Sequence, residues 1–341
     1  MKRAWLLISM VLTFCGLVFS NAILAEGKWS RKADLPVAMG FHSINEVNGK
    51  IYVIGGTDKF WFQDPKPFSK VYEYNPKTNI WSNKADMLTP RAWHRSSVID
   101  GKIYVIGGVE KKSVFSNAVE VYDPITDSWE IKTDIPIEKS EFAIGQVNGK
   151  IYVIGGHNIP PPAFSTVEEY DPRTDKWAVK SNMPIARTFI TGCVADNKIY
   201  VFGGSCDNLG LESFSTVEIY DPVTDTWKIG ADMPEPRAVL TSCAIDKMIY
   251  VMGGTDGSGR VYPTVDIYDT ENDEWIKDSD MPVARVSATN YPVIDGKIYV
   301  IGGVSSNLSF LSDVWEYKPE NLQFAVSSKG KLSTTWGELR K

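Results

Sequence analysis

One ten-residue sequence motif occurs four times along this chain, almost without change. Residues 47–56 and 147–156 both read VNGKIYVIGG, and residues 99–108 and 294–303 both read IDGKIYVIGG. Two more divergent copies bring the number of Gly doublets to six. The doublets lie 48 to 52 residues apart, at 55–56, 107–108, 155–156, 203–204, 253–254 and 302–303. A repeat of this length predicts an array of similar structural units, as in the blades of a propeller.

Two further markers recur in step with the Gly doublets. A turn phrase such as YDPITDSW (122–129) leads into a tryptophan phrase such as WEIKTDIP (129–136). The run KIYVI is apolar, β-branched and bounded by turn residues, which predicts a buried strand. The Asn-Gly or Asp-Gly pair before it suits the positive φ values of a two-residue hairpin turn. Each copy is therefore predicted to form four strands, named A (such as RSSVID), B (KIYVIGG), C (AVEVYD) and D (WEIKTD).

A single meander of four strands cannot bury its own faces, whereas six arranged around an axis bury each sheet between two neighbours. The predicted fold class is therefore all-β, a six-bladed β-propeller of four-stranded antiparallel blades. The Gly doublet that ends strand B, with Tyr and Trp at fixed offsets after it, resembles the kelch-repeat β-propeller family over residues 29 to about 317. Six concordant copies make this resemblance specific for fold and much less specific for function.

The chain offers two segments for the outer strand of the sixth blade. Residues 29–36 (WSRKADLP) carry a D-type pattern before the first A strand, and residues 318–324 (KPENLQF) imitate the turn before a D strand. We expect the N-terminal segment to complete the blade, because its pattern fits better and because an uncovered sheet edge is a liability.

The N-terminus has the pattern of a secretory signal peptide. Lys2 and Arg3 precede an apolar run over residues 4–19, and small residues follow it. We expect cleavage after Ala22 or Ala25, and a mature protein that is secreted, periplasmic or held at the cell surface. An uncleaved anchor is the alternative, although the run is short for a membrane span.

This interpretation divides the chain into three parts. Residues 1–25 are the predicted signal peptide, residues 26–325 the six-bladed kelch propeller, and residues 326–341 a C-terminal tail that matches no repeat. We expect no membrane insertion once the signal peptide is removed.

The composition excludes several classes of partner and site. The formal net charge is −6, and it becomes −8 without the two cations of the signal peptide, so an interaction with nucleic acid or with an anionic membrane surface is disfavoured. Cys193, Cys206 and Cys243 remain after cleavage, with irregular spacing, and the chain has three histidines. We therefore expect no disulfide-dependent fold and no metal. We also expect a monomer without a cofactor.

The two faces of the predicted ring differ. Strand direction alternates within a blade, so the D–A and B–C loops share one face, the loop face, and the tight A–B and C–D turns share the other, the hairpin face. Long loops at 57–70, 157–166 and 205–216 lie on the loop face. Because binding residues gather on loops held by a rigid scaffold, we place the binding site on the loop face and at the adjoining channel mouth.

A column of basic residues runs through the D–A loops. Alignment of the six loops places Met39, Arg91, Lys139, Arg187, Arg237 and Arg285 at one position. An Arg fork can bind a carboxylate or sulfate through two parallel hydrogen bonds, so this column predicts a broken ring of ligand-binding cations where the A strands enter the channel. The resemblance to kelch domains of ubiquitin-ligase substrate adaptors implies the same capability, because arginines similar in position grip acidic peptide side chains there. The alternative is that these residues only hydrogen-bond to carbonyls of neighbouring loops.

Two histidines share another column near the channel entrance. His42 and His94 are the third residues after the basic column in the first two copies, and we include both among the candidate ligand-binding residues. Phe142, Ile190 and Leu240 stand at the same position in later copies, so packing is the alternative role. Aromatic residues of the loops could stack on a sugar or peptide, or only pin the loops; they are Phe60, Trp61, Phe62, Phe115, Phe164, Phe214, Tyr262 and Phe310.

These features favour a secreted binding or interaction module for an anionic ligand, either an acidic peptide or protein or a carboxylated or sulfated glycan. The main rival is an enzyme. Bacterial sialic-acid mutarotases (N-acetylneuraminate epimerases) are secreted kelch propellers that act on an anionic sugar, and Glu141, Glu235, His42 or His94 could supply a proton-transfer group here. No motif singles out a catalytic residue. A purely architectural cell-surface protein is the third possibility.

Overall fold

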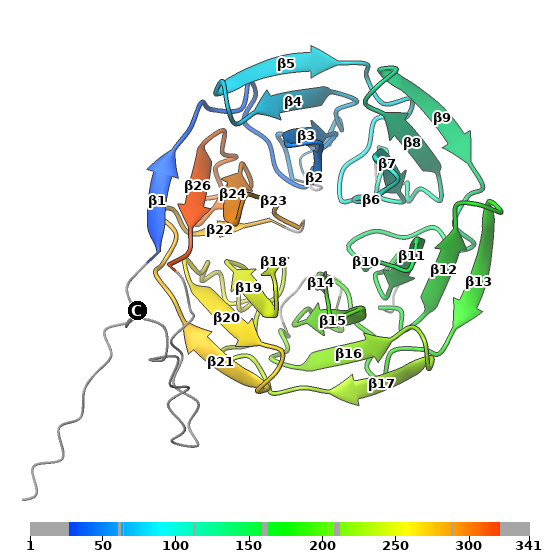
Figure 1. Cartoon of the computed structure of the whole chain (residues 1–341), viewed down its shortest axis with the longest axis vertical. Coiled ribbons are helices and arrows are strands. Elements are labelled where there is room, and N and C mark those ends of the chain that lie inside the picture. Colours follow the sequence, from blue (N-terminus) through cyan, green and yellow to red (C-terminus); the bar gives the residue numbers. More distant parts are fainter. Residues whose placement is uncertain are drawn as a thin grey trace, which may run out of the picture.

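The computed structural model describes residues 27–60, 63, 65–111, 114–158, 163–207, 212–287 and 290–320. Six four-stranded antiparallel sheets stand in a closed ring around a central axis, which confirms the predicted propeller (Figure 1). Within these residues no helix is long and apolar enough to cross a bilayer. The predicted signal peptide and the C-terminal tail lie outside the described residues.

The blades follow one another in chain order, and strands A to D run from the axis to the outer wall (Figure 1). Blades 1 to 3 contain β2 (Ser43–Val47), β3 (Lys50–Ile54), β4 (Val71–Asn75) and β5 (Ile80–Lys84); β6 (Arg95–Ile99), β7 (Lys102–Ile106), β8 (Val119–Asp123) and β9 (Ser128–Lys132); and β10 (Ala143–Val147), β11 (Lys150–Ile154), β12 (Val167–Asp171) and β13 (Lys176–Lys180). Blades 4 and 5 contain β14 (Thr191–Ala195), β15 (Lys198–Phe202), β16 (Val217–Asp221) and β17 (Thr226–Ile229); and β18 (Thr241–Ile245), β19 (Met248–Met252), β20 (Val265–Asp269) and β21 (Glu274–Lys277).

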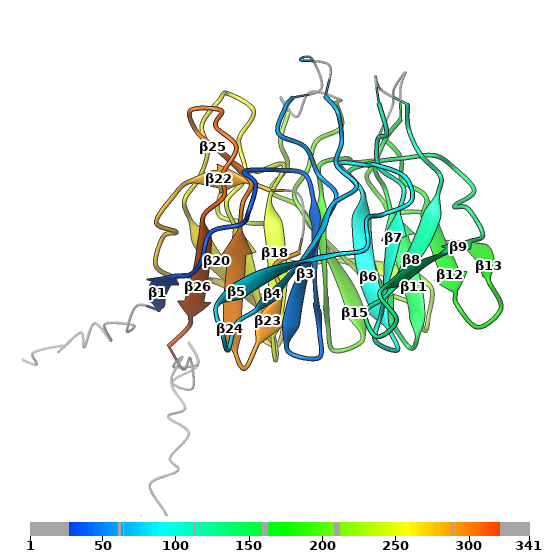
Figure 2. The ribbon, with the colours of Figure 1, turned by 90° about the horizontal axis from the view of Figure 1, so that it is seen from above.

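The sixth blade closes the ring with strands from both ends of the propeller. It contains β23 (Val293–Ile294), β24 (Lys297–Ile301), β26 (Val314–Lys318) and, outermost, β1 (Lys28–Arg31). Antiparallel pairing of β1 with β26 places Trp29 opposite Tyr317. The prediction that the N-terminal segment completes this blade is confirmed. A small extra pair, β22 (Arg285–Val286) with β25 (Val304–Ser305), lies above this blade on the loop face (Figure 2).

The repeated Tyr, Asp or Asn, and Trp residues fasten blades 1 to 5 to the blade before them. In blade 3 the Tyr170 hydroxyl and the backbone N–H of Thr133, from the end of blade 2, both donate to Asp175 Oδ1, at 2.6 and 2.9 Å. Trp177 Nε1 donates in return to the Thr133 carbonyl at 2.9 Å. The same contacts recur around Asn79, Asp127, Asp225 and Asp273. Because these joints are alike, each copy needs the same Tyr, Asp or Asn, and Trp residues at the same spacing.

The Gly doublets allow the inner layer to pack closely. Gly55 has φ +64°, and a Cβ atom there would lie 2.5 Å from the Arg91 carbonyl oxygen and 2.6 Å from His94 Cε1. A side chain would therefore clash with the D–A loop of the next blade. Backbone packing therefore explains the Gly doublet, and no ligand is needed to account for it.

The two faces of the ring are unequal (Figure 2). Long connections rise from the loop face, and short turns lie along the hairpin face, as predicted. The turn residues Asn48 and Gly49, for example, have φ values of +54° and +74°, which is the geometry of a two-residue hairpin.

Candidate functional site

The five basic residues of the D–A column do not surround the channel. Each side chain enters its own blade and is at most 1% exposed. The five residues are Arg91, Lys139, Arg187, Arg237 and Arg285. Each forms an ion pair with an acid from strand C of that blade or from the residue just before it. The pairs are Arg91–Glu120 (3.2 Å), Lys139–Glu168 (2.9 Å), Arg187–Glu218, Arg237–Asp266 and Arg285–Asp313 (2.8 Å).

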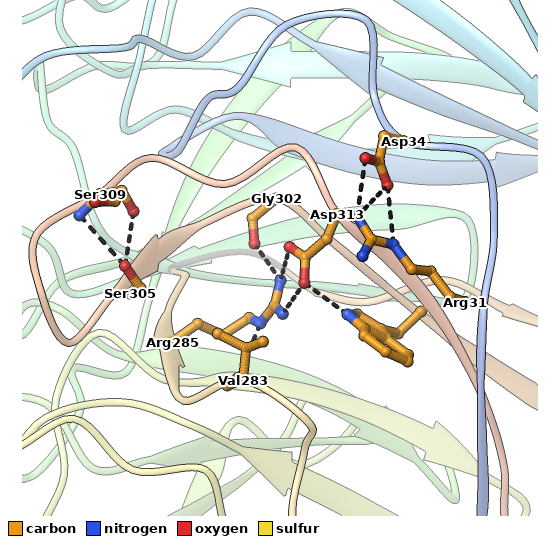
Figure 3. A network of polar contacts seen from close by, with 9 residues as sticks. Arg31, Asp34, Val283, Arg285, Gly302, Ser305, Ser309 and Asp313 are labelled. Carbon is orange, nitrogen blue, oxygen red and sulfur yellow. Dashed lines mark hydrogen bonds and ion pairs between the residues drawn. The ribbon is translucent and has the colours of Figure 1, made fainter.

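Backbone carbonyls also accept hydrogen bonds from the four arginines, whereas Lys139 Nζ donates to Thr166 Oγ1 at 2.8 Å. Arg187 Nη1 donates to the carbonyl of Gly203 at 2.6 Å and to that of Thr216 at 3.1 Å. Figure 3 shows the version in blade 6, where Arg285 meets Gly302, Val283 and Asp313. The basic residues therefore form internal clamps and not the open ring that was predicted. A charge buried in a blade must be paired and hydrogen-bonded, because an unpaired buried charge is strongly destabilising. Their side chains offer almost no surface to an external anion, and ligand binding by them stays a prediction.

The acid partners were missed at the sequence level, although a signal exists. Where Met39 replaces the basic residue in blade 1, Tyr72 stands at the place of the acid, so both charges are absent together. In blade 6 Trp315 takes the place of the acid, Asp313 supplies the carboxylate, and Trp315 Nε1 donates to it at 2.6 Å. This joint variation is what a structural pair requires.

The two candidate histidines are also internal. His42 is 1% exposed and His94 0%. His94 Nε2 lies 3.2 Å from Ser43 Oγ and 3.1 Å from the Ile54 carbonyl. Burial lowers the pKa of His42 to about 4 and that of His94 well below its usual value, so both rings are neutral at pH 7. Their Cε1 atoms pack against the first glycine of a doublet, at Gly302 and Gly55, which is a packing contact.

The loop aromatics divide into two groups. Phe164, Phe214 and Tyr262 lie over the buried cations Lys139, Arg187 and Arg237, with 5.1 to 6.0 Å between cation and ring centre, and so cover the internal clamps. Phe60 and Phe310 instead contact each other, 5.1 Å between ring centres, and both lie near Phe41. Phe115 packs 5.4 Å from His157. Trp61 and Phe62 lie outside the described residues.

A ring of strained residues lies where the D–A loops meet the axis. Phe41, Trp93, Glu141, Phe189 and Val239, here called the rim ring, occupy one position in blades 1 to 5, and all have φ between +54° and +57°. This conformation is costly for bulky and β-branched residues, by about 1–3 kcal/mol each, and such strain clusters at functional sites. It permits backbone hydrogen bonds around the axis, such as Trp93 N to Phe41 O (2.8 Å) and Glu141 N to Trp93 O (3.2 Å).

One member of the rim ring carries a charge-capable group without a partner. Glu141 is 2% exposed, and neither carboxyl oxygen has a hydrogen-bond partner among the described residues. Burial raises its pKa to about 8, opposed in part by attraction to Arg95. Arg95 is 3% exposed, and burial lowers its pKa to about 10. Its Nη1 donates to the His94 carbonyl at 3.2 Å, whereas its Nη2 has no partner among the described residues.

Arg95 and Glu141 belong to neighbouring blades, joined by the bond from Glu141 N to Trp93 O, and they do not form an ion pair. Glu141 belonged to the proton-transfer candidates, whereas Arg95 was missed. The signal was available, since Ser43, Ala143, Thr191 and Thr241 fill the position of Arg95 in the other aligned copies. Glu235, the other acidic candidate, is half-buried in the connection from β17 to β18.

Comparison with known proteins now adds to this geometry. A family model, the KLHDC2/KLHL20/DRC7 Kelch-repeats domain, matches residues 23–179 and 141–333. Kelch-like protein 41a of Danio rerio is 37% identical over 91 residues, which is 26% of this chain and 14% of that protein. Kelch repeat and BTB domain-containing protein 12 of Homo sapiens is 34% identical over 85 residues, which is 24% of this chain and 14% of that protein.

The match therefore spans only about a seventh of the length of these curated relatives. Among solved structures, that of YjhT superposes with a TM-score of 0.72 over 83% of this chain and 95% of that chain, at 17% identity, which is a likeness of fold. The sequence repeats, the six blades and the family match agree, and the chain belongs to the KLHDC2/KLHL20/DRC7 Kelch-repeats family.

Proposed function

We propose that this protein is a binding module whose loop face receives an anionic group of a partner at Arg95 and Glu141. Kelch-repeat propellers generally act as protein-interaction modules, so a protein carrying an exposed carboxylate is the first partner to consider. A carboxylated or sulfated glycan offers the same chemistry. The predicted signal peptide supports action outside the cytoplasm, which is part of the same proposal.

The unpartnered groups of Arg95 and Glu141 carry the proposal. A raised pKa keeps Glu141 protonated at pH 7, so it is an O–H donor, and Arg95 Nη2 is a cationic N–H donor. Two buried donors without an acceptor are costly, and natural proteins rarely leave such groups unsatisfied. A carboxylate or sulfate has the acceptor oxygens to satisfy both, and charge-assisted hydrogen bonds of this type are the strong ones.

The surrounding side chains favour a partner with an apolar flank. Phe41 and Trp93 stack with ring centres 4.8 Å apart, and the half-buried Phe60 and Phe310 lie beside Phe41. Aromatic surface of this kind provides contact area to a peptide or to the apolar face of a sugar. Because Arg95 and Glu141 are almost fully buried, a small anionic group reaches them only if rim side chains shift.

A binding experiment with three ligand arms tests the proposal. Acetylated glutamate-rich peptide, sialyllactose and a sulfated disaccharide are titrated by calorimetry into the wild type, Arg95→Met and Arg31→Met. Arg31 is the matched control because it removes the same charge from an exposed ion pair with Asp34. We expect at least one arm to bind the wild type and the control equally, and Arg95→Met at least tenfold more weakly. Equal affinity in all three proteins would refute the site.

A second candidate is an enzyme that acts on an acidic sugar, as the resemblance to sialic-acid mutarotases suggests. The carboxyl of Glu141 favours it, because a pKa near 8 suits a group that exchanges protons at neutral pH. Arg95 would then hold the carboxylate of the sugar. Anomeric exchange of sialic acid, followed by NMR, should be faster with the wild type than with Glu141→Gln. If both proteins leave exchange at the uncatalysed rate and the calorimetric test shows binding, the enzyme is ruled out and the binding module remains.

A further inference from the structure

The innermost strand of blade 6 departs from the repeat. Ten positions separate Arg285 from Asp295, whereas nine separate the corresponding residues Arg91 and Asp100 in blade 2. The extra residue falls before Asn290-Tyr291-Pro292, and only Val293 and Ile294 remain paired as β23. The chain therefore leaves the regular strand path at the loop-face end of the channel.

Asn290 crosses to a blade that is not its neighbour. Its Nδ2 donates to the Gly192 carbonyl at 2.8 Å, and its Oδ1 accepts from Thr191 Oγ1 at 3.2 Å. Gly192 and Thr191 belong to blade 4, so these bonds pass blade 5 and span the channel. The position of His42 and His94 is filled by fully buried residues in blades 3 to 5, namely Phe142, Ile190 and Leu240. These contacts lie across the loop-face end of the channel.

A cavity of about 290 Å³ lies beneath these contacts, lined by residues of β2, β6, β10, β14 and the segment 290–292. Exposure of its lining increases towards the hairpin face. Ile44 and Ile144 are each 4% exposed, whereas Val98 is half-buried and Gln146, nearer the turns, is exposed. The cavity thus extends from these contacts towards the hairpin face, where its most exposed lining residue, Gln146, lies.

We propose that this pocket binds a small uncharged polyol about the size of one monosaccharide. Amide and hydroxyl groups of Asn45, Ser97 and Gln146 line it beside apolar Val98 and Val194, a mixture that suits the polar edge and apolar face of a sugar. Glu46 is the only charged residue of the lining, and its Oε1 accepts from Gly49 N at 2.6 Å. A carboxylate or sulfate would meet this acid with no cation to offset it, which excludes the anionic ligands of the loop face.

Saturation-transfer NMR with glucose, myo-inositol and glucuronate tests the pocket. We expect signal from at least one uncharged probe and at least fivefold less from glucuronate. Gln146→Trp and Val98→Trp, two independent ways to fill the mouth, should each abolish the signal in protein whose thermal unfolding is unchanged. Arg95→Met should leave it intact, which separates this site from the loop face. No signal from either uncharged probe, equal signal from glucuronate, or a signal that survives both Trp variants would overturn the proposal.

Discussion

Arg187 and Glu218 form an ion pair inside blade 4, and both side chains are completely buried. Their blade holds them away from water on all sides, so removal of one partner leaves the other charge uncompensated. We expect Arg187→Ala to lower the free energy of unfolding by about 3–5 kcal/mol. Arg173→Ala, which breaks an exposed pair with Asp171, should change it by less than about 1 kcal/mol. Urea unfolding followed by tryptophan fluorescence measures both, and equal effects would contradict an internal clamp.

Blade 1 suggests how such a clamp can be replaced. Met39 and Tyr72 stand there in place of the cation and the acid. Arg91→Met alone should destabilise blade 2 by about 3 kcal/mol, because it leaves Glu120 buried and unpaired. The double variant Arg91→Met with Glu120→Tyr should recover most of that loss. A double-mutant cycle in urea gives the coupling energy, and an additive result would mean that the two residues act independently.

Glu141 should make the stability of the protein depend on pH. Its pKa is about 8 in the folded state and about 4.5 when unfolded, so the folded protein keeps a proton that the unfolded chain loses. Stability from this group is therefore greatest below pH 4.5 and declines until about pH 8, by about 5 kcal/mol in total. Glu141→Gln should flatten the unfolding free energy between these values. An unchanged slope would show that the carboxyl is solvated.

The histidines act in the opposite direction. Because burial lowers the pKa of His42 to about 4 and that of His94 well below 6.5, their contribution is complete above pH 6.5 and is lost as the pH falls towards 4. His94→Phe adopts the residue found at the same position in blade 3, Phe142. We expect this variant to lose less stability than the wild type between pH 6.5 and 4.5 in thermal melts. Parallel curves would indicate that His94 is not buried as a neutral ring.

Much of the fold could be predicted because its determinants are local and repeated. The phrase KIYVIGG fixes strand B and its turns, and six copies imply the ring. Even the closing strand followed from the pattern at Trp29. This joint also differs from the others, since Trp29 Nε1 has no partner among the described residues, although its ring packs against Tyr317 as the corresponding Trp and Tyr rings do in the other blades. That difference depends on where the chain ends meet, which the repeat does not encode.

The site was harder to predict, because a one-dimensional column does not give side-chain direction. Arg91 and its counterparts line up in the sequence, yet each points into its blade towards an acid that lies 28 to 31 residues later in the chain. Arg95 was overlooked because it is the one charged residue at a repeat position that small residues fill in the other aligned copies, so no column of basic residues marks it. Charged residues that replace small or apolar ones at a single repeat are the more informative signal.

The proposed loop-face site depends most on a protonated Glu141 that shares an anion with Arg95. Carbon-detected NMR of side-chain carboxyls, with the Glu141 signal assigned by its absence from Glu141→Gln, measures this directly. We expect a titration midpoint near pH 8 that moves higher when a carboxylate ligand binds, because the ligand favours the protonated donor. A midpoint near 4.5, or one that the ligand leaves in place, would contradict the proposed site.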